Sequence, residues 1–496
     1  MSAGKLYGVG LGPGDPELMT VKAARLISEA AVIAYHCARH GRSIARSVAE
    51  PYLREGQIEE KLVYPVTTET TDHPGGYEGA IADFYELSAK RLAEHLDAGR
   101  DVVLLCEGDP FFYGSYMYMH ERLSGRYEAV VVPGVTSVSA ASSVFGRPLV
   151  QRDEVLTVLP GTLPAPELAR RLADTDAAAV LKLGRTFSSV REAFAEAGKL
   201  DDAVYVERAT WGRQRIEPLA SVDPSTVPYF SLALLPSPAY ASRQSPVSPA
   251  PAPASGGEVV VVGLGPAGPE WLTPEAASEL SAAEHIVGYG PYVARVPQKA
   301  GQQRHASGNR VEADRAREAL DLAASGSRVA VVSSGDPGVF AMASAVLEQV
   351  SLGHGTGVRV RIVPGVTAAQ AAASRVGAPL GHDYCVLSLS DRLKPWEIIE
   401  KRLDAAGAAD LVLALYNPAS RTRTTQLADA RAVLLRHRSA ATPVVVARDV
   451  GGSEEDIRVT TLGELDPSTV DMRCLLIVGS SRTRSENGIV WTPRSY

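Results

Sequence analysis

The chain carries the same short loop twice, and the residue types in that loop suit a binding site. The stretches VVPGVTSVSAASSVFGRPLV (Val131–Val150) and IVPGVTAAQAAASRVGAPLG (Ile362–Gly381) agree at 11 of 20 aligned positions. In each copy an apolar strand ends in a Pro-Gly turn, and a threonine (Thr136 or Thr367) then stands where a small-residue helix begins. A helix start offers unpaired backbone N–H groups, and the threonine adds a hydroxyl. The pattern predicts a ligand site in two copies, with a well-packed helix entry as the alternative.

A Gly-Asp-Pro motif also occurs once in each half, at Gly108–Pro110 and Gly335–Pro337. Each motif follows a short apolar run, VVLLC or VAVVS, and therefore stands at the carboxyl end of a predicted strand. Open α/β sheets bind ligands outside those ends, and glycine permits close backbone approach. The aspartate could accept hydrogen bonds from an amine or a ribose, or it could cap the following helix. Its recurrence beside the other loops favours a role in binding.

The third repeated loop is glycine-rich: GVGLGPGD near Pro13, and VGLGPAG near Pro266. Such turns resemble dinucleotide fingerprints, but those need an acidic residue about 20 positions later, and neither following strand ends in one. The prolines also remove an N–H from the turn. A nicotinamide or flavin site is therefore disfavoured, and a tight turn without a ligand stays possible for this loop alone. Because no Ser-His-Asp, HExxH or P-loop pattern is present, the loops favour noncovalent capture of a nucleoside-like cofactor by backbone groups.

The three loops recur in one order, which indicates a duplicated or fused chain. Short strands alternate with helical stretches of 10–15 residues, so we expect α/β units with largely parallel sheets, each followed by a second lobe of similar style. A Pro/Ala/Ser-rich linker at 236–257 separates a first unit, 1–235, from a second unit, 258–496. We expect the linker to be dispensable and each unit to fold and bind its cofactor by itself.

The units differ in one interval. Pro13 and Asp109 are 96 positions apart (109 minus 13), whereas Pro266 and Asp336 are 70 apart (336 minus 266). The polar, turn-rich segment Tyr64–Gly79 is the predicted place of the extra residues. We interpret it as a mobile flap that helps to select the first unit's substrate, with a functionless surface insertion as the alternative.

Composition excludes several other classes of protein. A net charge of −7 over 496 residues argues against binding nucleic acid mainly by phosphate neutralisation. No apolar run is long enough to predict a membrane span, and the amino terminus has no signal-peptide pattern. The four scattered cysteines form no metal-binding or disulfide pattern, which favours a reducing cytoplasm. We expect no metal site, no nucleic-acid partner and no membrane partner.

The repeated stretches GLGPGDPELMT, EGDPFFYG and VPGVTSVSAASSVFGRPL, with their second copies, resemble the tetrapyrrole methylases that use S-adenosylmethionine. In the first half, VLPGTLP, VLKLGRTF and VYVERAT are similar to precorrin-2 C20-methyltransferases. In the second half, LSLSDRLKPWEIIEKRL, LALYNPASRTR and the terminal TPRSY are similar to precorrin-3B C17-methyltransferases. The second half departs at Ala267, where the first has Gly14; a small residue is kept.

This resemblance implies a tandem pair of two-lobed class III methyltransferase units that act in cobalamin biosynthesis. The first would convert precorrin-2 to precorrin-3A, and the second precorrin-3B to precorrin-4 with contraction of the macrocycle. S-adenosylmethionine would be the methyl donor. The implied cofactor contacts are Pro13, Gly108, Asp109, Pro110, Thr136 and Ser137, then Pro266, Gly335, Asp336, Pro337, Thr367 and Ala368, and by position Lys182, Leu183, Gly184, Tyr416, Asn417 and Pro418.

The tetrapyrrole acceptor carries many carboxylates, which arginine recognises well. The candidates are Arg147, Arg185, Arg208 and Arg213 in the first half and Arg392, Arg421, Arg423 and Arg448 in the second, each with a solvated surface role as the alternative. Ring contraction needs acid and base groups, for which His382, Asp383 and Asp391 are candidates; a turn and a helix cap are the alternative for them.

Other functions stay open at the level of sequence. The acceptor could be metal-free or carry cobalt. A methylase of the same fold could act on protein or RNA, although acidity, doubling and the stretches in each half count against it. A duplicated nucleotide-binding module without chemistry is the alternative of another class. The two homologous units are expected to pair within one chain or between two chains as a homodimer.

Overall fold

The computed structural model describes residues 3–38, 43–66, 71, 73–151, 154–237, 257–308, 311–392, 394–420, 422–486 and 488–493. The linker between 238 and 256 therefore lies outside the described residues. By its internal contacts the chain divides into two compact units, Met1–Thr136 and Ser137–Tyr496. The sequence boundaries at 235 and 258 thus delimit the repeat, whereas the compact units divide elsewhere.

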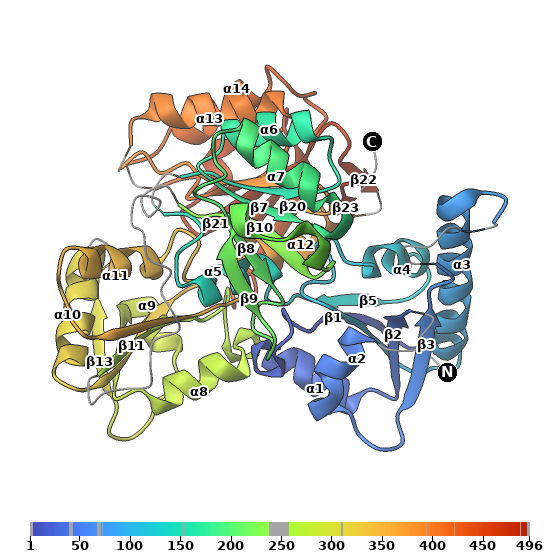
Figure 1. Cartoon of the computed structure of the whole chain (residues 1–496), viewed down its shortest axis with the longest axis horizontal. Coiled ribbons are helices and arrows are strands. Elements are labelled where there is room, and N and C mark those ends of the chain that lie inside the picture. The colour runs from blue at the N-terminus through green and yellow to red at the C-terminus, as the bar shows by residue number, and fades with distance from the viewer. Residues whose placement is uncertain are drawn as a thin grey trace. The chain divides into compact units, whose positions relative to one another are not determined.

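The first compact unit is built on a parallel five-stranded sheet with the order β3-β2-β4-β1-β5 (blue to teal strands in Figure 1). Its strands are β1 (Leu6–Gly10), β2 (Val32–Cys37), β3 (Ile58–Val63), β4 (Val102–Cys106) and β5 (Ala129–Val132). Its helices are α1 (Val21–Glu29), α2 (Ile44–Ala49), α3 (Gly76–Asp97) and α4 (Tyr116–Leu123), with the 3₁₀ helices η1 (Pro16–Leu18) and η2 (Glu50–Tyr52). The parallel crossovers through helices match the expected α/β pattern.

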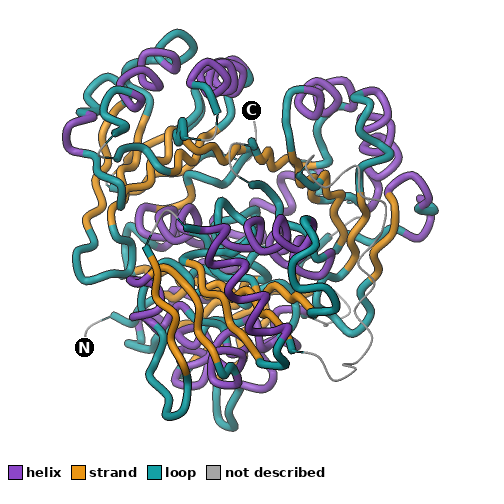
Figure 2. The backbone as a smooth tube through the Cα atoms, turned by 90° about the vertical axis from the view of Figure 1, so that its left-hand side faces the viewer, coloured by secondary structure: helices purple, strands orange, loops and turns teal. Residues whose placement is uncertain are grey.

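The second compact unit contains an equivalent parallel sheet with the order β13-β12-β14-β11-β15. Figure 2 faces this sheet and shows its strands running alongside one another with helices against them. The strands are β11 (Glu258–Gly263), β12 (His285–Tyr289), β13 (Gln303–Ser307), β14 (Arg328–Ser333) and β15 (Arg359–Val363). The helices are α8 (Pro274–Ala282), α9 (Gly290–Arg295), α10 (Glu312–Ala324) and α11 (Met342–Ser351), after η7 (Pro269–Trp271).

The same local signals start equivalent helices in the two sheets. Thr20 Oγ1 accepts a hydrogen bond from Ala23 N at 3.2 Å at the start of α1, and Thr273 Oγ1 does so from Ala276 N at 3.1 Å in α8. A threonine cap supplies an acceptor for a first-turn N–H that has no partner within the helix. Because both caps end the PELMT and PEWLT stretches, the glycine-rich loop and the following helix recur as one unit.

A ten-stranded sheet in the second compact unit joins the second lobes of both halves, in the order β20-β19-β21-β18-β17-β6-β7-β10-β8-β9. The first half supplies β6 (Leu156–Pro160), β7 (Ala177–Leu181), β8 (Val204–Glu207), β9 (Arg215–Pro218) and β10 (Ser231–Leu235). The second half supplies β17 (Tyr384–Ser388), β18 (Val412–Tyr416), β19 (Pro443–Arg448), β20 (Asp456–Thr461) and β21 (Cys474–Val478). Each half thus contributes five strands in the same internal order.

The second-lobe helices are α5 (Ser137–Phe145), α6 (Ala165–Ala173), α7 (Phe187–Glu196), α12 (Ala368–Val376), α13 (Trp396–Ala408) and α14 (Gln426–Leu434). The 3₁₀ helices are η3 (Gly184–Thr186), η4 (Leu219–Ser221), η5 (Pro224–Thr226) and η8 (Pro467–Thr469). The strands β16 (Gly377–Ala378), β22 (Arg484–Glu486) and β23 (Ile489–Trp491) form a small separate sheet.

The ten-stranded sheet is mixed, which differs from the largely parallel arrangement expected for the second lobes. Only β6–β7 and β17–β18 pair in parallel, and the other pairs are antiparallel. The chain between β8 and β9, and between β19 and β20, is a short turn. Such a turn cannot carry the crossover that a parallel neighbour requires.

The strand pair β6–β17 joins the two halves about a local two-fold axis. Leu156 and Tyr384 are equivalent positions, because each opens its strand opposite the first residue of the next parallel strand. In the antiparallel pair, Leu156 lies opposite Val386, Thr157 opposite Cys385, and Val158 opposite Tyr384. The register is therefore symmetric about Thr157 and Cys385, which is the geometry of a self-complementary interface. The second lobes of the two halves are therefore paired within this chain.

Two ion pairs cross this junction in opposite directions. Arg171 Nη1 of α6 lies 2.5 Å from Asp383 Oδ2 in the second half, and both side chains are buried. Arg402 Nη2 of α13 lies 2.8 Å from Asp176 Oδ2 in the first half. Burial raises the pKa of Asp383 to about 6 although the charge of Arg171 acts in the opposite direction. The stability of the junction therefore depends on keeping the buried charges of Arg171 and Asp383 paired with each other.

The extra length of the first unit is distributed over several places. Compared with the second copy, the β2–β3 connection and the loop before α3 are both longer. Helix α3 itself has 22 residues, against 13 in α10. Positions 76–79 of the predicted flap form the first turn of α3, and 67–70 and 72 lie outside the described residues. The interpretation of Tyr64–Gly79 as one flap inserted into the shared framework is thus only partly compatible with the structure.

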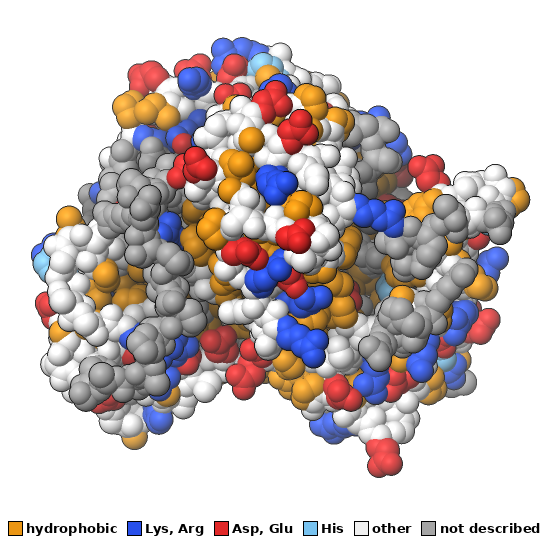
Figure 3. Space-filling model, viewed as in Figure 1, with side chains coloured by type: hydrophobic (Ala, Val, Ile, Leu, Met, Phe, Trp, Pro, Cys, Tyr) orange, Lys and Arg blue, Asp and Glu red, His pale blue; other side chains and the backbone are white. Residues whose placement is uncertain are grey.

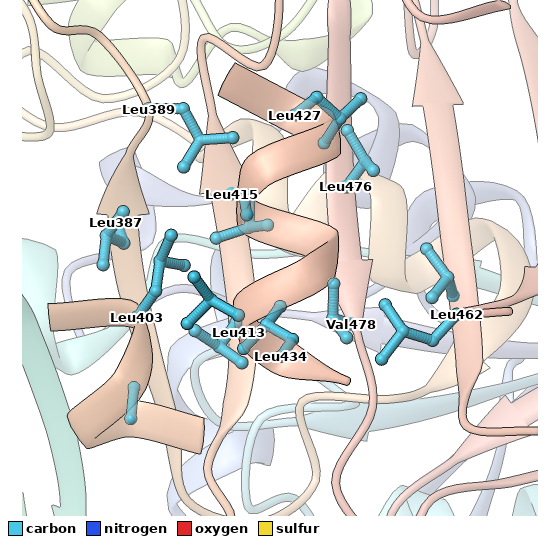
Figure 4. Close-up of a cluster of buried hydrophobic side chains, with 14 of the residues drawn as sticks. Leu387, Leu389, Leu403, Leu413, Leu415, Leu427, Leu434, Leu462, Leu476 and Val478 are labelled. Carbon is cyan, nitrogen blue, oxygen red and sulfur yellow. The ribbon is translucent and has the colours of Figure 1, made fainter. Parts of the chain in front are cut away.

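Surface and core are those of an ordinary globular protein. On the face seen in Figure 3, acidic and basic side chains are intermixed rather than segregated into one basic field. In the second half, α13 and α14 cover strands β17, β18 and β21 with buried leucines and valines (Figure 4). Of the helices in the described parts of the chain, none has the length and apolarity needed to cross a membrane.

Replacing Arg171 by Leu should destabilise the chain by about 3 kcal/mol, because Asp383 would keep a buried carboxylate without its cation. Urea unfolding at pH 7.5 measures the change. Arg170→Leu is the matched control, since Arg170 neighbours Arg171 on α6 but is exposed. Equal stability of the two variants would show that the cross-half ion pair contributes nothing.

Candidate functional site

The three repeated loops of the first unit meet at the carboxyl edge of its sheet. Strands β4, β1 and β5 are adjacent and parallel, so the loops that follow them lie side by side. Gly12 N donates to Gly108 O at 3.3 Å, and Gly108 N donates to Gly12 O at 2.8 Å. Leu11 N donates to Cys106 O at 2.9 Å. These bonds fasten the glycine-rich loop to the Gly-Asp-Pro loop.

Glycine is required where the loops approach one another. A Cβ at Gly134 would lie 2.1 Å from Gly108 O, and one at Gly10 would lie 2.6 Å from Gly134 N. Both distances are shorter than any real contact, so a side chain at either position would force the backbones apart. Gly108 has a φ of 65°, and a Cβ there would meet no atom within 4 Å. The outer side of Gly108 is therefore open to a ligand that approaches the backbone.

Asp109 ties the Gly-Asp-Pro loop to the Pro-Gly-Val-Thr loop. Its Oδ1 accepts a hydrogen bond from Phe111 N at 2.9 Å, and its Oδ2 accepts one from Gly134 N at 3.0 Å. The side chain is buried. Burial raises the pKa of Asp109 to about 7, although the two N–H donors act to lower it. Both carboxylate oxygens thus bond to the protein backbone, which gives Asp109 a role in holding the loops that is distinct from direct ligand contact.

The second copy repeats this arrangement. Gly265 N donates to Gly335 O at 3.2 Å, and Gly335 N donates to Gly265 O at 2.8 Å. Asp336 Oδ1 accepts from Gly338 N at 2.8 Å, and its Oδ2 accepts from Gly365 N at 3.2 Å. Burial raises the pKa of Asp336 to about 6 against the opposing effect of its hydrogen-bond donors. The loop geometry is therefore a property of the repeat.

In the second half, a tyrosine from the second lobe reaches the entry of α12. Thr367 caps that helix by accepting a hydrogen bond from Gln370 N at 3.2 Å. Tyr416, the last residue of β18, accepts a hydrogen bond at its hydroxyl from Ala369 N at 3.2 Å. Its ring also lies 5.4 Å from the ring of Phe340, just beyond the Gly-Asp-Pro loop. The structure thus brings Gly335–Pro337, Thr367, Ala368 and Tyr416 together.

The turns after β7 and β18 each begin with a residue in the left-handed region. Lys182 has a φ of 60° and Asn417 a φ of 51°, in the left-handed region that a non-glycine residue seldom adopts. Asn417 Nδ2 donates to Ser388 Oγ at 3.0 Å, and Asn417 O accepts from Arg423 Nε at 2.9 Å. In the first half, Thr186 Oγ1 donates to Lys182 O at 2.9 Å. Both strained turns are held in place by hydrogen bonds.

The remaining predicted cofactor residues lie where their loops place them. Pro13 and Pro266 follow the fastened glycines and are partly exposed, and Thr136 is buried. Ser137 is the first residue of α5, and Leu183 and Gly184 complete the turn after β7. These three residues belong to the compact unit that begins at Ser137. No feature of the structure assigns a ligand contact to them directly, so their role stays a prediction.

The first-half arginines differ in their surroundings. Arg208 and Arg213 line a surface recess of about 410 Å³ together with Trp211 and Gly212, between β8 and β9. In Figure 3, Lys and Arg side chains gather in the region where Figure 1 places these strands. Arg208 also pairs with the neighbouring Glu207. Arg147 lies over the ring of Phe145, and Arg185 is exposed on η3.

The second-half arginines are mostly engaged by the protein itself. Arg423 is buried and bonds to Asn417 O, with Asp391 Oδ1 at 3.7 Å. Arg448 bonds to Asp471 Oδ2 at 2.8 Å and to Glu454 Oε2 at 3.1 Å. Arg392 is exposed, and Arg421 lies outside the described residues. Arg423 therefore holds the turn after β18 by its hydrogen bond to Asn417 O. Both Arg423 and Arg448 already have carboxylates as neighbours.

The three candidate acid–base residues fall at opposite ends of β17. His382 and Asp383 precede the strand, at its amino end, with His382 Nδ1 3.5 Å from Asp383 Oδ1. The α12 entry and Tyr416 lie at the carboxyl edge, about 17 Å away for a five-residue strand. This placement favours a structural role for His382 and Asp383 at the junction of the halves. Asp391 follows β17 at the carboxyl edge and accepts a hydrogen bond from Gln426 Nε2 at 2.7 Å.

Two further residues hold the loops, and the sequence did not single them out. Arg295 of α9 donates to Gly265 O at 2.8 Å, to Leu264 O at 3.1 Å and to Ser334 Oγ at 3.1 Å. In the first unit, the side chain of Glu107 instead accepts a hydrogen bond from Ala45 N at 3.1 Å at the start of α2. Glu107 could have been noticed because it adjoins Gly108. Arg295, a single arginine within a predicted helix, has no sequence motif beside it that would mark it as a loop-holding residue.

No group of three His, Cys, Asp or Glu side chains within the described ranges is arranged to bind a metal ion. The four cysteines are free thiols and are buried.

Asp109 and Asp336 should make stability depend on pH. A folded-state pKa above the usual value near 3.9 means that the native state holds the proton more tightly. Their contribution to the unfolding free energy is fully present below about pH 4 and is lost as the pH rises through about 6 for Asp336 and about 7 for Asp109. Asp109→Asn and Asp336→Asn should each flatten the decline between pH 4 and 7.5, measured by urea unfolding. The exposed Asp201→Asn variant is the control, and a wild-type slope in all three would contradict the buried titration.

Comparison with known proteins agrees with these two loop sets. The model of the Tetrapyrrole (Corrin/Porphyrin) Methylases matches residues 5–223 and 258–466. The cobalamin biosynthesis protein CobIJ of Mycobacterium tuberculosis (strain ATCC 25618 / H37Rv) is 60% identical over 505 residues, which cover 100% of this chain and 97% of the relative. The precorrin-2 C(20)-methyltransferase of Sinorhizobium sp is 51% identical over 48% of this chain and 96% of its own length. The precorrin-3B C(17)-methyltransferase of Sinorhizobium sp is 47% identical over 48% of this chain and 97% of its own length. The chain therefore belongs to the tetrapyrrole (corrin/porphyrin) methylases and contains two units of that family in tandem.

Proposed function

We propose that the chain is a bifunctional C-methyltransferase of cobalamin biosynthesis that uses S-adenosylmethionine as the methyl donor in both units. The unit at 1–235 methylates C20 of precorrin-2, and the unit at 258–496 methylates C17 of precorrin-3B with ring contraction. The observation that carries this proposal is the 60% identity with CobIJ along the whole chain, together with a separate match of each half to one of the two named enzymes.

The residues present fit S-adenosylmethionine. Gly108 offers an open backbone face at the carboxyl edge of its sheet, and the second copy repeats the loop geometry. S-adenosylmethionine supplies a methyl group already activated by its sulfonium. The task of the chain is to hold donor and acceptor carbon in line and to exclude water. The left-handed turns at Lys182 and Asn417 and the bonded loops keep the backbone groups preorganised for that task.

In the first half, an arginine-lined recess lies at the same sheet edge as the donor turn. A Cβ at Gly184 would lie 3.7 Å from Tyr229 Cα, so this turn contacts the segment before β10. That segment in turn contacts the recess: Arg208 N donates to Phe230 O at 3.0 Å, and the Trp211 and Phe230 rings are 6.0 Å apart. Side-chain carboxylates of precorrin-2 would bind Arg208 and Arg213 there.

The second half presents a different acceptor edge. Arg448 and Arg473 share Glu454 as a partner, and Asp449 and Asp471 bind one arginine each. This network leaves fewer uncompensated positive charges than the recess of the first half. Asp391, at the carboxyl edge beside Arg423 and Gln426, is the acid–base candidate that we retain for ring contraction. The different edges are in keeping with two different acceptors.

Asp109→Ala should weaken the first methylation and spare the second, and Asp336→Ala should do the reverse. Each change leaves two buried N–H groups without an acceptor and releases the Pro-Gly loop of its own unit. We expect donor affinity in that unit to fall on the order of tenfold or more. Mass spectrometry of products from precorrin-2 and from precorrin-3B, each with S-adenosylmethionine, separates the activities. Loss of thermal stability without any loss of affinity for S-adenosylmethionine would show that the aspartate stabilises the fold and has no effect on donor binding.

Arg213→Ala should raise the KM for precorrin-2 roughly tenfold, because one carboxylate partner of the acceptor is removed. The dissociation constant for S-adenosylhomocysteine should not change, since Arg213 is outside the donor loops. Arg458→Ala, another arginine at a sheet edge but in the second half, is the matched control. A change in donor affinity with an unaltered KM for precorrin-2 would place Arg213 outside the acceptor site.

A further inference from the structure

The donor loop of the second half is in contact with a segment of the first half. Asp336, which ties the second Gly-Asp-Pro loop to its Pro-Gly loop, also accepts a hydrogen bond from the Ser139 side chain of α5. Val150 N donates to Gly338 O at 3.4 Å, and Val150 forms an isolated parallel bridge with Val339. Ser139 and Val150 are both buried. The contact therefore combines buried side chains with hydrogen bonds between the two halves.

The loop of the second half is shaped to receive this segment. A Cβ at Gly338 would lie 3.1 Å from Asp336 Oδ1 and 3.4 Å from Ser142 Oγ. The equivalent position in the first half is Phe111, since both residues follow an Asp-Pro pair. Glycine at 338 thus leaves the space that Ser142 and the segment after α5 occupy. A larger residue there would press on the aspartate and on the serine together.

The residues that make the contact are not shared by the two copies. In the aligned loops Ser139 corresponds to Gln370, and Ser142 corresponds to Ala373. Gln370 accepts a hydrogen bond from the hydroxyl of Thr367 in its own copy. Ser139 instead reaches an aspartate almost 200 positions later in the chain. The contact is thus particular to the α5 segment of the first half and cannot be ascribed to the repeat alone.

We propose that Ser139, Ser142 and Val150, although part of the first half, are positioning elements of the second methyl transfer. Ser139 acts through Asp336 by donating a hydrogen bond to its carboxylate. Val150 fixes the backbone of the loop after Asp336 by donating to Gly338 O. The second donor site is therefore incomplete in a chain that contains only 258–496. This inference deepens the proposed function and rests on it for the identity of the donor.

The proposal also changes the expectation that each half binds its donor independently. Helix α5 begins at Ser137, a predicted contact of the first donor site, and one of its first residues, Ser139, bonds to the aspartate of the second. One short helix is thus attached to a loop of the other half. Separating the halves would remove a hydrogen-bond donor and a backbone bond from the second donor loop, even if the second half folds.

The test is titration of full-length chains with S-adenosylhomocysteine, together with the pH dependence of precorrin-3B methylation. Ser139→Ala should weaken binding at one of two sites on the order of tenfold, because a hydrogen bond to a charged group is lost. The Ser139 hydroxyl lowers the pKa of Asp336, so its removal should move the acidic limb of the precorrin-3B pH profile to higher pH. A purely structural role would lower stability without moving that limb.

Ser143→Ala is the matched control, because Ser143 lies on the same helix and its hydroxyl donates to Ser139 O within the helix. It should leave both readouts unchanged. In an Asp336→Asn background, Ser139→Ala should have no further effect on the pH profile, since the two residues act as one unit. Wild-type affinity and an unmoved pH limb in Ser139→Ala would overturn the inference. Failure of the wild-type chain to bind S-adenosylhomocysteine would instead count against the proposed function.

Discussion

Each set of repeated loops depends on one buried aspartate that accepts hydrogen bonds from backbone N–H groups of two loops. Asp109 and Asp336 are each bonded at one oxygen to their own loop and at the other to a Pro-Gly loop that arrives from an adjacent strand. Without this acceptor, two N–H groups would be buried and unpaired, and the glycines could not stay in close contact. The carboxylate therefore fixes the spacing of the loops, while the outer backbone face of Gly108 in the first copy stays open.

The pairing of β6 with β17 has a comparable importance for the chain as a whole. It converts two five-stranded second lobes into one ten-stranded sheet and covers the strand edge that each lobe would otherwise expose. The Arg171–Asp383 pair then favours this register, because a shifted strand would leave a buried charge alone, and the partly exposed Arg402–Asp176 pair adds a second cross-half contact. Covalent fusion supplies both partners of this interface in equal amounts.

Duplication has not produced two equivalent sites. The backbone geometry of the repeated loops is shared, but the ion pairs around the turns after β8 and β19 differ, and α3 is much longer than α10. The loop after Asp336 has glycine where the first copy has phenylalanine, and that space is filled by a segment of the first half. The shared part is the hydrogen-bonded loop framework, and the divergent parts include the loop that contacts the other half.

The sequence alone determined the repeat, the three loops, their place at the carboxyl ends of strands, and the family, because all of these are local patterns of glycine, proline and apolar residues. It suggested Asp109 and Asp336 as ligand contacts, whereas the structure shows both oxygens bonded to the backbone. It could not distinguish His382 and Asp383 from Asp391, since a polar stretch does not reveal at which end of a strand each residue lies. The β6–β17 register, the Arg295 bonds and the Ser139–Asp336 contact were decided only in the tertiary structure. Each joins residues that are well separated along the chain, and their pairing depends on how complete sheets and helices pack together.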